Sequence, residues 1–148
     1  MKKLLSLLLI LIFATSLTWG AKEKAPKKPK KGKATVASST AVGYKVDGDK
    51  IIFMYNPKDY PSGFDEAEMV TVAGEFNSWD AGAKDWQAVL DKKDGVWYFE
   101  STKGVVASGT KFKFVVNTVD WQQPDDKKVP KENLFDDGFG GFNLVVIY

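Results

Sequence analysis

The 148-residue chain contains no cysteine, no histidine and no arginine, so all 21 of its basic residues are lysine. These absences exclude several classes of site. Disulfide bonds and thiol nucleophiles need cysteine, and a Ser-His-Asp triad needs histidine. Zinc sites built from Cys and His are excluded for the same reason, and so is a bidentate arginine clamp for phosphate. A lipoprotein anchor is excluded because it requires a cysteine.

The first 20 residues have the order of charge and hydropathy that is typical of a secretory signal peptide. Met-Lys-Lys is followed by Leu4–Leu17, a run of 14 residues without a charge, and then by Thr-Trp-Gly-Ala at 18–21. The apolar run is shorter than the 18 or more residues expected of a membrane span. We predict a signal peptide over 1–20, cleaved near Gly20/Ala21, and no membrane span in the mature chain. With cleavage we expect a secreted or periplasmic protein. An uncleaved anchor is the alternative, and either reading predicts that the domain lies outside the cytoplasm.

A lysine-rich and proline-containing segment follows. Residues 22–33 hold seven lysines against one glutamate and have nothing to bury, so we expect a disordered linker over 21–39. It is either a spacer or a basic arm that touches an anionic envelope polymer. The remaining domain, 40–148, has the opposite charge balance. Residues 34–148 carry 12 lysines against 18 acidic residues, which argues against nucleic acid as a ligand.

The domain is predicted to consist of β-strands. No segment after residue 40 repeats with a 3.6-residue period, whereas alternating and β-branched or aromatic runs recur between turn signals such as Asp47-Gly48 and Asp94-Gly95. This pattern predicts an all-β sandwich of about seven strands. The expected strands are Val42–Val46, Lys50–Tyr55, Met69–Ala73, Trp86–Leu90, Val96–Thr102, Lys111–Asn117 and Phe142–Tyr148.

Alternation within the expected strands assigns their faces. Phe112, Phe114 and Val116 share one face of their strand and are expected in the core. Lys113 lies on the opposite face and is expected to point toward solvent or a ligand. In the last strand, Asn143 is likewise turned away from the core.

Two tryptophans lie in turns rather than in strands, and a third follows soon after the first. Trp79 lies in the segment 74–80, Trp121 in the segment 117–124, and Trp86 follows seven residues after Trp79. Such a ring either folds back to cap the core or faces a ligand. Two exposed rings together would form a platform for the apolar C–H face of a sugar, with lysine and amide side chains hydrogen bonding to the hydroxyl groups.

Several of these segments carry a family resemblance. The stretch Val70-Thr-Val-Ala-Gly-Glu-Phe-Asn-Ser-Trp79 is similar to the opening signature of carbohydrate-binding module family 48, which includes the glycogen-binding domain of the AMP-activated protein kinase β subunit and N-terminal domains of branching and debranching enzymes. The similarity continues in order over roughly residues 50–148. It includes Gly95-Val-Trp-Tyr-Phe, Lys111-Phe-Lys-Phe-Val-Val-Asn117, Trp121-Gln-Gln-Pro124 and Phe139-Gly-Gly-Phe-Asn143.

The resemblance implies an immunoglobulin-like β-sandwich that binds α-glucan. It implies that Trp79 and Trp121 stack on glucose units, that Lys113 and Asn143 contact sugar hydroxyls, and that Phe139 lies against the sugar. The segment before Trp121 reads Asn-Thr-Val-Asp, where the kinase-type members have a tighter Asp-Gly hairpin, and this difference can alter the angle between the two rings.

The leading hypothesis is therefore a secreted, non-catalytic module whose partner is an α-glucan polysaccharide or oligosaccharide, with a glucan-active enzyme or an envelope protein as a further partner. The alternative is an extracellular or envelope module that uses the same sandwich to bind protein. A small glycosidase would need two opposed carboxylates. The acidic pairs Asp65-Glu66, Asp125-Asp126 and Asp136-Asp137 are interpreted instead as solvated turn residues. No catalytic residue, metal site or cofactor is expected.

Overall fold

The computed structural model describes residues 40–61, 64 and 66–148. The predicted signal peptide, 1–20, and the predicted linker, 21–39, lie outside the described residues. Within the part of the chain that is described, no helix has the length and apolar character needed to cross a membrane.

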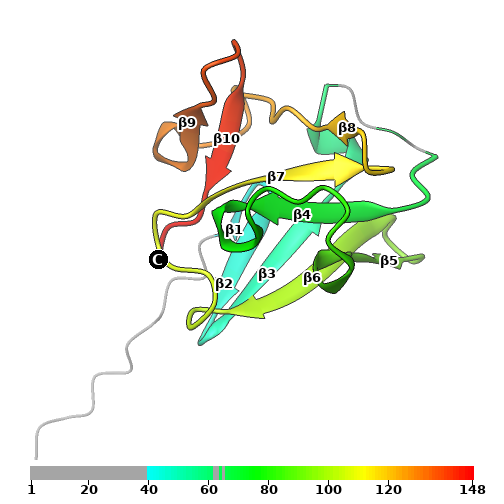
Figure 1. Cartoon of the computed structure of the whole chain (residues 1–148), viewed down its shortest axis with the longest axis horizontal. Coiled ribbons are helices and arrows are strands. Elements are labelled where there is room, and N and C mark those ends of the chain that lie inside the picture. The colour runs from blue at the N-terminus through cyan, green and yellow to red at the C-terminus, as the bar shows by residue number, and fades with distance from the viewer. Residues whose placement is uncertain (1–39, 62–63, 65) are drawn as a thin grey trace, which may run out of the picture. The chain divides into compact units, whose positions relative to one another are not determined.

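In the described part of the chain, ten strands form two antiparallel sheets that pack as a sandwich (Figure 1). The first sheet has the order β1-β2-β3-β6-β5, and the second has the order β4-β7-β10-β9, with β8 paired to β7. The first sheet comprises β1 (Thr40–Ala41), β2 (Tyr44–Asp47), β3 (Lys50–Tyr55), β5 (Val89–Asp91) and β6 (Val96–Thr102). The second comprises β4 (Val70–Gly74), β7 (Lys111–Val116), β8 (Asp120–Trp121), β9 (Leu134–Asp136) and β10 (Phe142–Val145).

The prediction of an all-β sandwich is confirmed. The strands outnumber the expected seven because four of the ten contain only two or three residues. Such short strands pair at sheet edges and leave little alternation in the sequence to detect.

Both turn signals occupy turns of the structure. Asp47 pairs with Lys50 across the β2–β3 turn, and Gly48 between them has a φ of +59°. The β5–β6 turn has Gly95 at a φ of +74°, while the Asp94 carboxylate accepts a hydrogen bond of 2.9 Å from the Val96 amide. Left-handed φ values explain why glycine stands at these two positions.

Two expected boundaries differ from the structure by three residues, and the remaining ones differ by two residues or fewer. The last strand ends at Val145 rather than Tyr148, because the backbone of Val146 bonds instead to the turn before β7: its N–H donates to Thr110 and its carbonyl accepts from Gly109. The expected strand from residue 86 begins only at Val89, because Lys84–Trp86 form a 3₁₀ turn.

The core lies between the sheets and is largely aromatic. Phe112, Phe114 and Val116 are completely buried, as alternation predicts. Phe53 of the first sheet meets Phe112 of the second edge-to-face, with ring centroids 4.8 Å apart. Phe114 in turn packs against Tyr55 of the first sheet at 5.4 Å.

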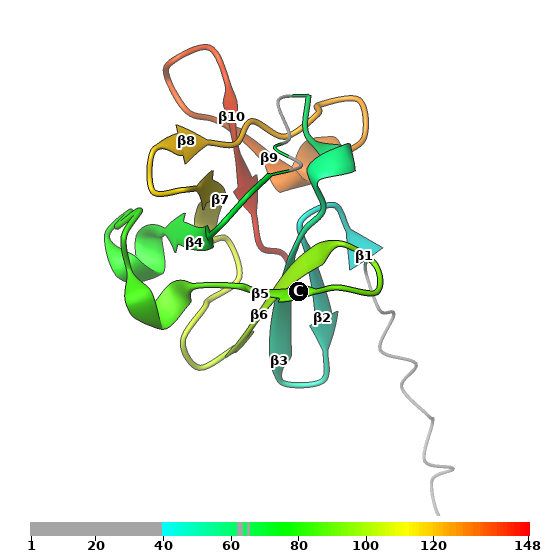
Figure 2. The same cartoon turned by 90° about the vertical axis from the view of Figure 1, so that its right-hand side faces the viewer.

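The outer face of the second sheet is covered rather than open. Lys113 does point away from the aromatic core, but only 7% of its side chain is exposed. Of the two alternatives, open solvent is therefore wrong for Lys113, because loop residues that are distant in sequence fold over this face, and the side chain lines a cleft instead. The β9–β10 loop, which projects beyond β8 in Figure 2, supplies the partner of Lys113.

Candidate functional site

The outer side of the second sheet carries a cleft of about 420 Å³, within the size range of ligand sites. Four segments far apart in the sequence contribute to it: the turn after β4, the middle of β7, the β8 region, and the β9–β10 loop with the start of β10. The residues that line the cleft are Trp79, Lys113, Trp121, Gln123, Asp137, Phe139 and Asn143. All five predicted site residues are thus brought together, and Gln123 and Asp137 join them.

Trp79 is presented by a tight turn that Asn77 organises. The Asn77 side-chain oxygen accepts from the Gly74 amide at 2.9 Å, and its NH₂ group donates to the Val72 carbonyl at 2.9 Å. The Trp79 amide then donates to the Gly74 carbonyl at 2.9 Å and closes the turn. A Cβ atom at Gly74 would approach the Lys111 carbonyl to 2.6 Å, so this turn requires glycine there.

The backbone of this turn is strained where it holds the ring. Ser78 and Trp79 have φ values of +56° and +61°, a region that bulky side chains rarely occupy. Each residue forced into that region costs about 1–2 kcal/mol relative to an ordinary conformation. Strained backbone conformations are concentrated at functional sites, where a side chain has to be held in place. The positive φ values of this turn therefore support a functional role for Trp79.

Trp121 reaches the same cleft from the hairpin that β7 and β8 form. It pairs with Val115 of β7 after a turn in which Asn117 and Thr118 have φ values of +50° and +64°. The next residue, Gln122, is buried and accepts a hydrogen bond of 3.2 Å from the Tyr55 hydroxyl. This anchor in the core holds the flanking Trp121 and Gln123 at the cleft.

The two tryptophan rings lie side by side but are not coplanar. Their centroids are 6.3 Å apart, and their planes make an angle of 44°. Together they form a bent apolar wall rather than a flat platform. The third tryptophan, Trp86, has a different role: it stacks on Phe76 with centroids 4.0 Å apart and packs against the core.

Lys113 and Asp137 form an ion pair at the cleft. The Lys113 ammonium donates to the Asp137 carboxylate at 2.5 Å, and the exposed fractions of the two side chains are 7% and 6%. The hydrogen bond from Lys113, together with those from loop amides, holds the pKa of Asp137 well below its usual value despite the opposing effect of desolvation. The carboxylate is therefore ionised at neutral pH.

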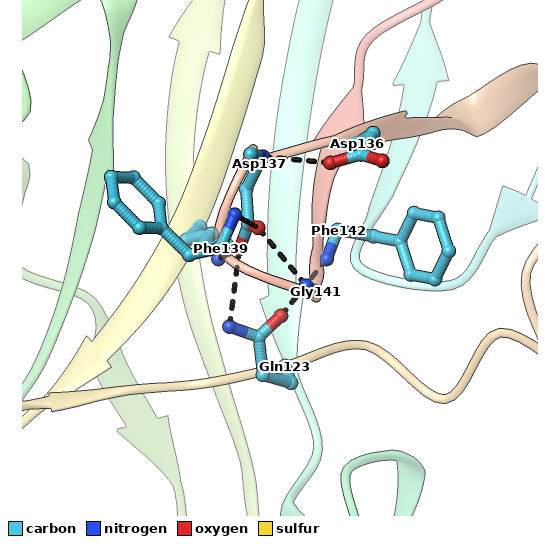
Figure 3. Close-up of polar contacts among 8 residues, drawn as sticks. Gln123, Asp136, Asp137, Phe139, Gly141 and Phe142 are labelled. Carbon is cyan, nitrogen blue, oxygen red and sulfur yellow. Dashed lines mark hydrogen bonds and ion pairs between the residues drawn. The ribbon is translucent and has the colours of Figure 1, made fainter.

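The Asp137 carboxylate also organises the β9–β10 loop (Figure 3). Its Oδ1 atom accepts from the Phe139 amide at 2.8 Å and from the Gly141 amide at 3.0 Å. Its Oδ2 atom accepts from Lys113 and, at 3.4 Å, from the Gln123 side chain. One carboxylate thereby connects β7, the segment after β8 and the loop that carries Phe139.

Gln123 completes this network on the other side. Its side-chain oxygen accepts from the Phe142 amide at 3.1 Å, while its NH₂ group faces Asp137. The amide lies so close to Gly141 that a Cβ atom there would collide with it. Figure 3 shows the rings of Phe139 and Phe142 on opposite sides of the polar cluster, and the Phe139 ring is almost fully exposed at the rim.

Sequence reasoning missed Asp137 and Gln123 for different reasons. The sequence predicts that Asp137, like Asp136, is a solvated turn acid. That interpretation is correct for Asp136, which is exposed and accepts from the Gly138 amide at 2.7 Å, but wrong for Asp137. No local signal separates the two, because the lysine partner of Asp137 is 24 residues away. Gln123 had a signal, since it lies beside Trp121 in the Trp-Gln-Gln-Pro segment.

The cleft therefore has a defined chemistry. Its walls are aromatic, and amide groups and a carboxylate-paired ammonium supply its polar atoms. Among the described residues, no group of three or more acidic, histidine or cysteine side chains could hold a metal ion. Such an arrangement can stack on an apolar face of a ligand and exchange hydrogen bonds with its hydroxyl groups.

No protein-family model matches the chain, and no curated protein matches it either. The candidate function below therefore rests on the geometry of the cleft and on the sequence segments that form it.

Proposed function

We propose that the protein is a secreted, non-catalytic module that binds α-glucan chains in this cleft. The observation that carries the proposal is that the predicted site residues, far apart in the sequence, lie together. Trp79, Lys113, Trp121, Phe139 and Asn143 were selected from the sequence, span 65 positions of the chain, and line one cleft. Strand alternation by itself places only two of them on a common face.

The angle between the tryptophan rings supports an α-linked ligand. Successive glucose units turn relative to one another in an α-1,4-linked chain, whereas they form a flat ribbon in a β-1,4-linked chain. Rings inclined at 44° match two sugar faces that are also inclined, while a flat ribbon is better matched by coplanar rings. Stacking of this kind buries apolar area at little entropic cost, because a tryptophan side chain has only two torsions.

The polar groups suit the hydroxyls of a neutral sugar. Gln123 and Asn143 each carry both a donor and an acceptor, as a hydroxyl group does. Lys113 retains two further ammonium protons beyond the one donated to Asp137. With both donors and acceptors in the cleft, each sugar hydroxyl can either donate or accept a hydrogen bond.

The arrangement of carboxylates supports a binding role without catalysis. Glycoside hydrolysis uses two carboxyl groups that flank the scissile bond, one of them protonated to act as an acid. Among the described residues, Asp137 is the one acidic residue that lines the cleft, and its lowered pKa keeps it ionised. It is also fully engaged with Lys113 and the loop amides, so it is unsuited to act as a general acid.

A protein-binding module is the second candidate, and the exposed aromatic residues favour it. Phe139 is 96% exposed and Phe135, on the neighbouring β9 strand, is 50% exposed. Exposed apolar rings around a cleft are also typical of protein interfaces.

Affinity electrophoresis separates the two candidates. The purified protein is run in native gels with and without glycogen, amylopectin or a β-glucan of similar size. The proposal predicts retardation by the α-glucans and not by the β-glucan. Unretarded migration in every α-glucan gel would reject the sugar-binding proposal and leave the protein-binding candidate.

A further inference from the structure

The cleft is electrically balanced by a single internal pair. Of the seven residues that line it, one is a cation, one is an anion, and the two are bonded to each other. The other five are uncharged. A ligand that enters the cleft therefore meets no uncompensated positive charge.

The sequence next to the cleft residues supplies no further cation. Asp80 follows Trp79, Asp120 precedes Trp121, and Asp136 lies beside the β9–β10 loop. The other lysine of β7 nearby, Lys111, is itself paired with Glu75 at 2.9 Å. Both lysines of this strand are thus paired with carboxylates, so neither offers a free positive charge to an anion.

We propose that Asp137 is a specificity-determining residue: by pairing with Lys113 it makes the cleft select neutral sugar chains and reject chains that carry phosphate, sulfate or carboxylate groups. This inference rests on the proposed function. A neutral hydroxyl can share the remaining protons of Lys113 while the ion pair stays intact. An anionic group would have to displace Asp137 or lie against it.

Displacement of Asp137 is disfavoured by its other contacts. Its carboxylate is held by the amides of Phe139 and Gly141 and by Gln123, in addition to Lys113. Moving it would break these bonds and release the loop that forms one wall of the cleft. Rejection of an unsuitable ligand through an internal like charge is a recognised route to specificity.

The substitution Asp137→Asn tests the inference with little change of shape. Asparagine retains an oxygen that can accept from the loop amides, but it leaves Lys113 uncompensated. Isothermal titration calorimetry is carried out with maltoheptaose and with maltoheptaose carrying one 6-phosphate. Wild type is expected to prefer the neutral sugar. In Asp137→Asn the ratio of the two affinities should move toward the phosphorylated sugar by roughly tenfold, as expected for one new charge-assisted hydrogen bond.

Two matched variants separate pairing from net charge. Asp136→Asn removes the same charge from the adjacent exposed residue and should leave the affinity ratio within about twofold of wild type. The double change Lys113→Gln with Asp137→Asn removes the cation as well and should abolish the gain. Equal shifts in Asp136→Asn and Asp137→Asn would overturn the inference, because net charge alone would then explain them.

The remaining outcomes are distinguishable. If wild type binds maltoheptaose but Asp137→Asn loses affinity for both sugars equally, Asp137 only supports the loop, and the inference fails while the proposed function stands. If wild type binds neither sugar, both fail. Should Asp137→Asn not fold, amine labelling of the wild type decides: Lys113 should react more slowly than the exposed Lys50, and equal reactivity would overturn the pairing on which the inference depends.

Discussion

The ammonium of Lys113 and the carboxylate of Asp137 lie 2.5 Å apart, with both side chains almost completely buried beside the cleft. Lys113 comes from the middle of β7 and Asp137 from the residue that follows β9. Their contact joins the rigid sheet to the loop that bears Phe139. The geometry of the cleft therefore depends on a pair of charges that also contributes to the stability of the fold.

Removal of Lys113 is expected to destabilise the protein. In Lys113→Ala the Asp137 carboxylate would remain in a confined site without its main partner, an arrangement that is much costlier than loss of a surface pair. We expect the midpoint of thermal unfolding to fall by about 4 °C or more.

The Lys50–Glu100 pair provides the matched control, because its distance is 2.8 Å but more than half of each side chain is exposed. Lys50→Ala should lower the midpoint by less than half as much. Equal shifts in calorimetric scans would show that Lys113 is as exposed in solution as Lys50.

The ion pair should give a defined response to acid. Because the folded-state pKa of Asp137 lies well below its ordinary value of 3.8, the stability from its charge is present above that value and is lost as the pH falls toward the folded pKa. The difference in unfolding free energy between wild type and Asp137→Asn should stay constant from about pH 7 to 5 and narrow below about pH 4. Glu75, whose pKa is also lowered, is common to both proteins and cancels. Urea unfolding at each pH measures the difference, and narrowing near pH 6 would contradict the assignment.

The tryptophan rings should carry much of the binding energy. Trp79→Ala and Trp121→Ala are each expected to weaken α-glucan binding at least tenfold, a loss of about 1.4 kcal/mol or more. Tyr98→Ala, in the first sheet and away from the cleft, should bind as wild type does. Affinity electrophoresis against glycogen compares the three. Normal binding by both tryptophan variants would remove the stacking role.

Position 79 offers a second comparison that separates binding from backbone strain. Both Trp79→Ala and Trp79→Gly remove the ring, but only glycine adopts a φ of +61° without penalty. The glycine variant should therefore be more stable than the alanine variant by about 1 kcal/mol, with equal loss of binding. Denaturant melts provide the test, and a more stable alanine variant would show that the turn changes its conformation when the ring is removed.

Truncation of a buried aromatic side chain should strongly destabilise the fold. Phe114 is fully buried between the sheets, so Phe114→Ala is expected to cost about 3–5 kcal/mol of unfolding free energy. Val119, in the exposed β7–β8 turn, is the control, and Val119→Ala should change stability by less than about 0.5 kcal/mol. Similar midpoints for the two variants in guanidinium would refute the packing described for β7.

Local features of the sequence determined the fold class and the faces of the main strands. Alternation in Lys111–Asn117 correctly separated Phe112 and Phe114 from Lys113, because side-chain direction in a strand depends only on position along it. Asp47-Gly48 and Asp94-Gly95 marked their turns because the required φ values are set by the residues of the turn themselves. The candidate site residues were likewise chosen from short segments that resemble a known family.

Tertiary structure decided how those residues meet. The angle between Trp79 and Trp121 depends on two turns that lie close together because β4 and β8 both pair with β7. The burial of Lys113, and the difference between the exposed Asp136 and the paired Asp137, depend on contact with a loop 24 residues further along the chain. Strand periodicity describes which side of a sheet a residue occupies, but contacts between distant segments determine whether that side is open, covered or paired with a charge. For this protein, those contacts turn five separate residues into one cleft.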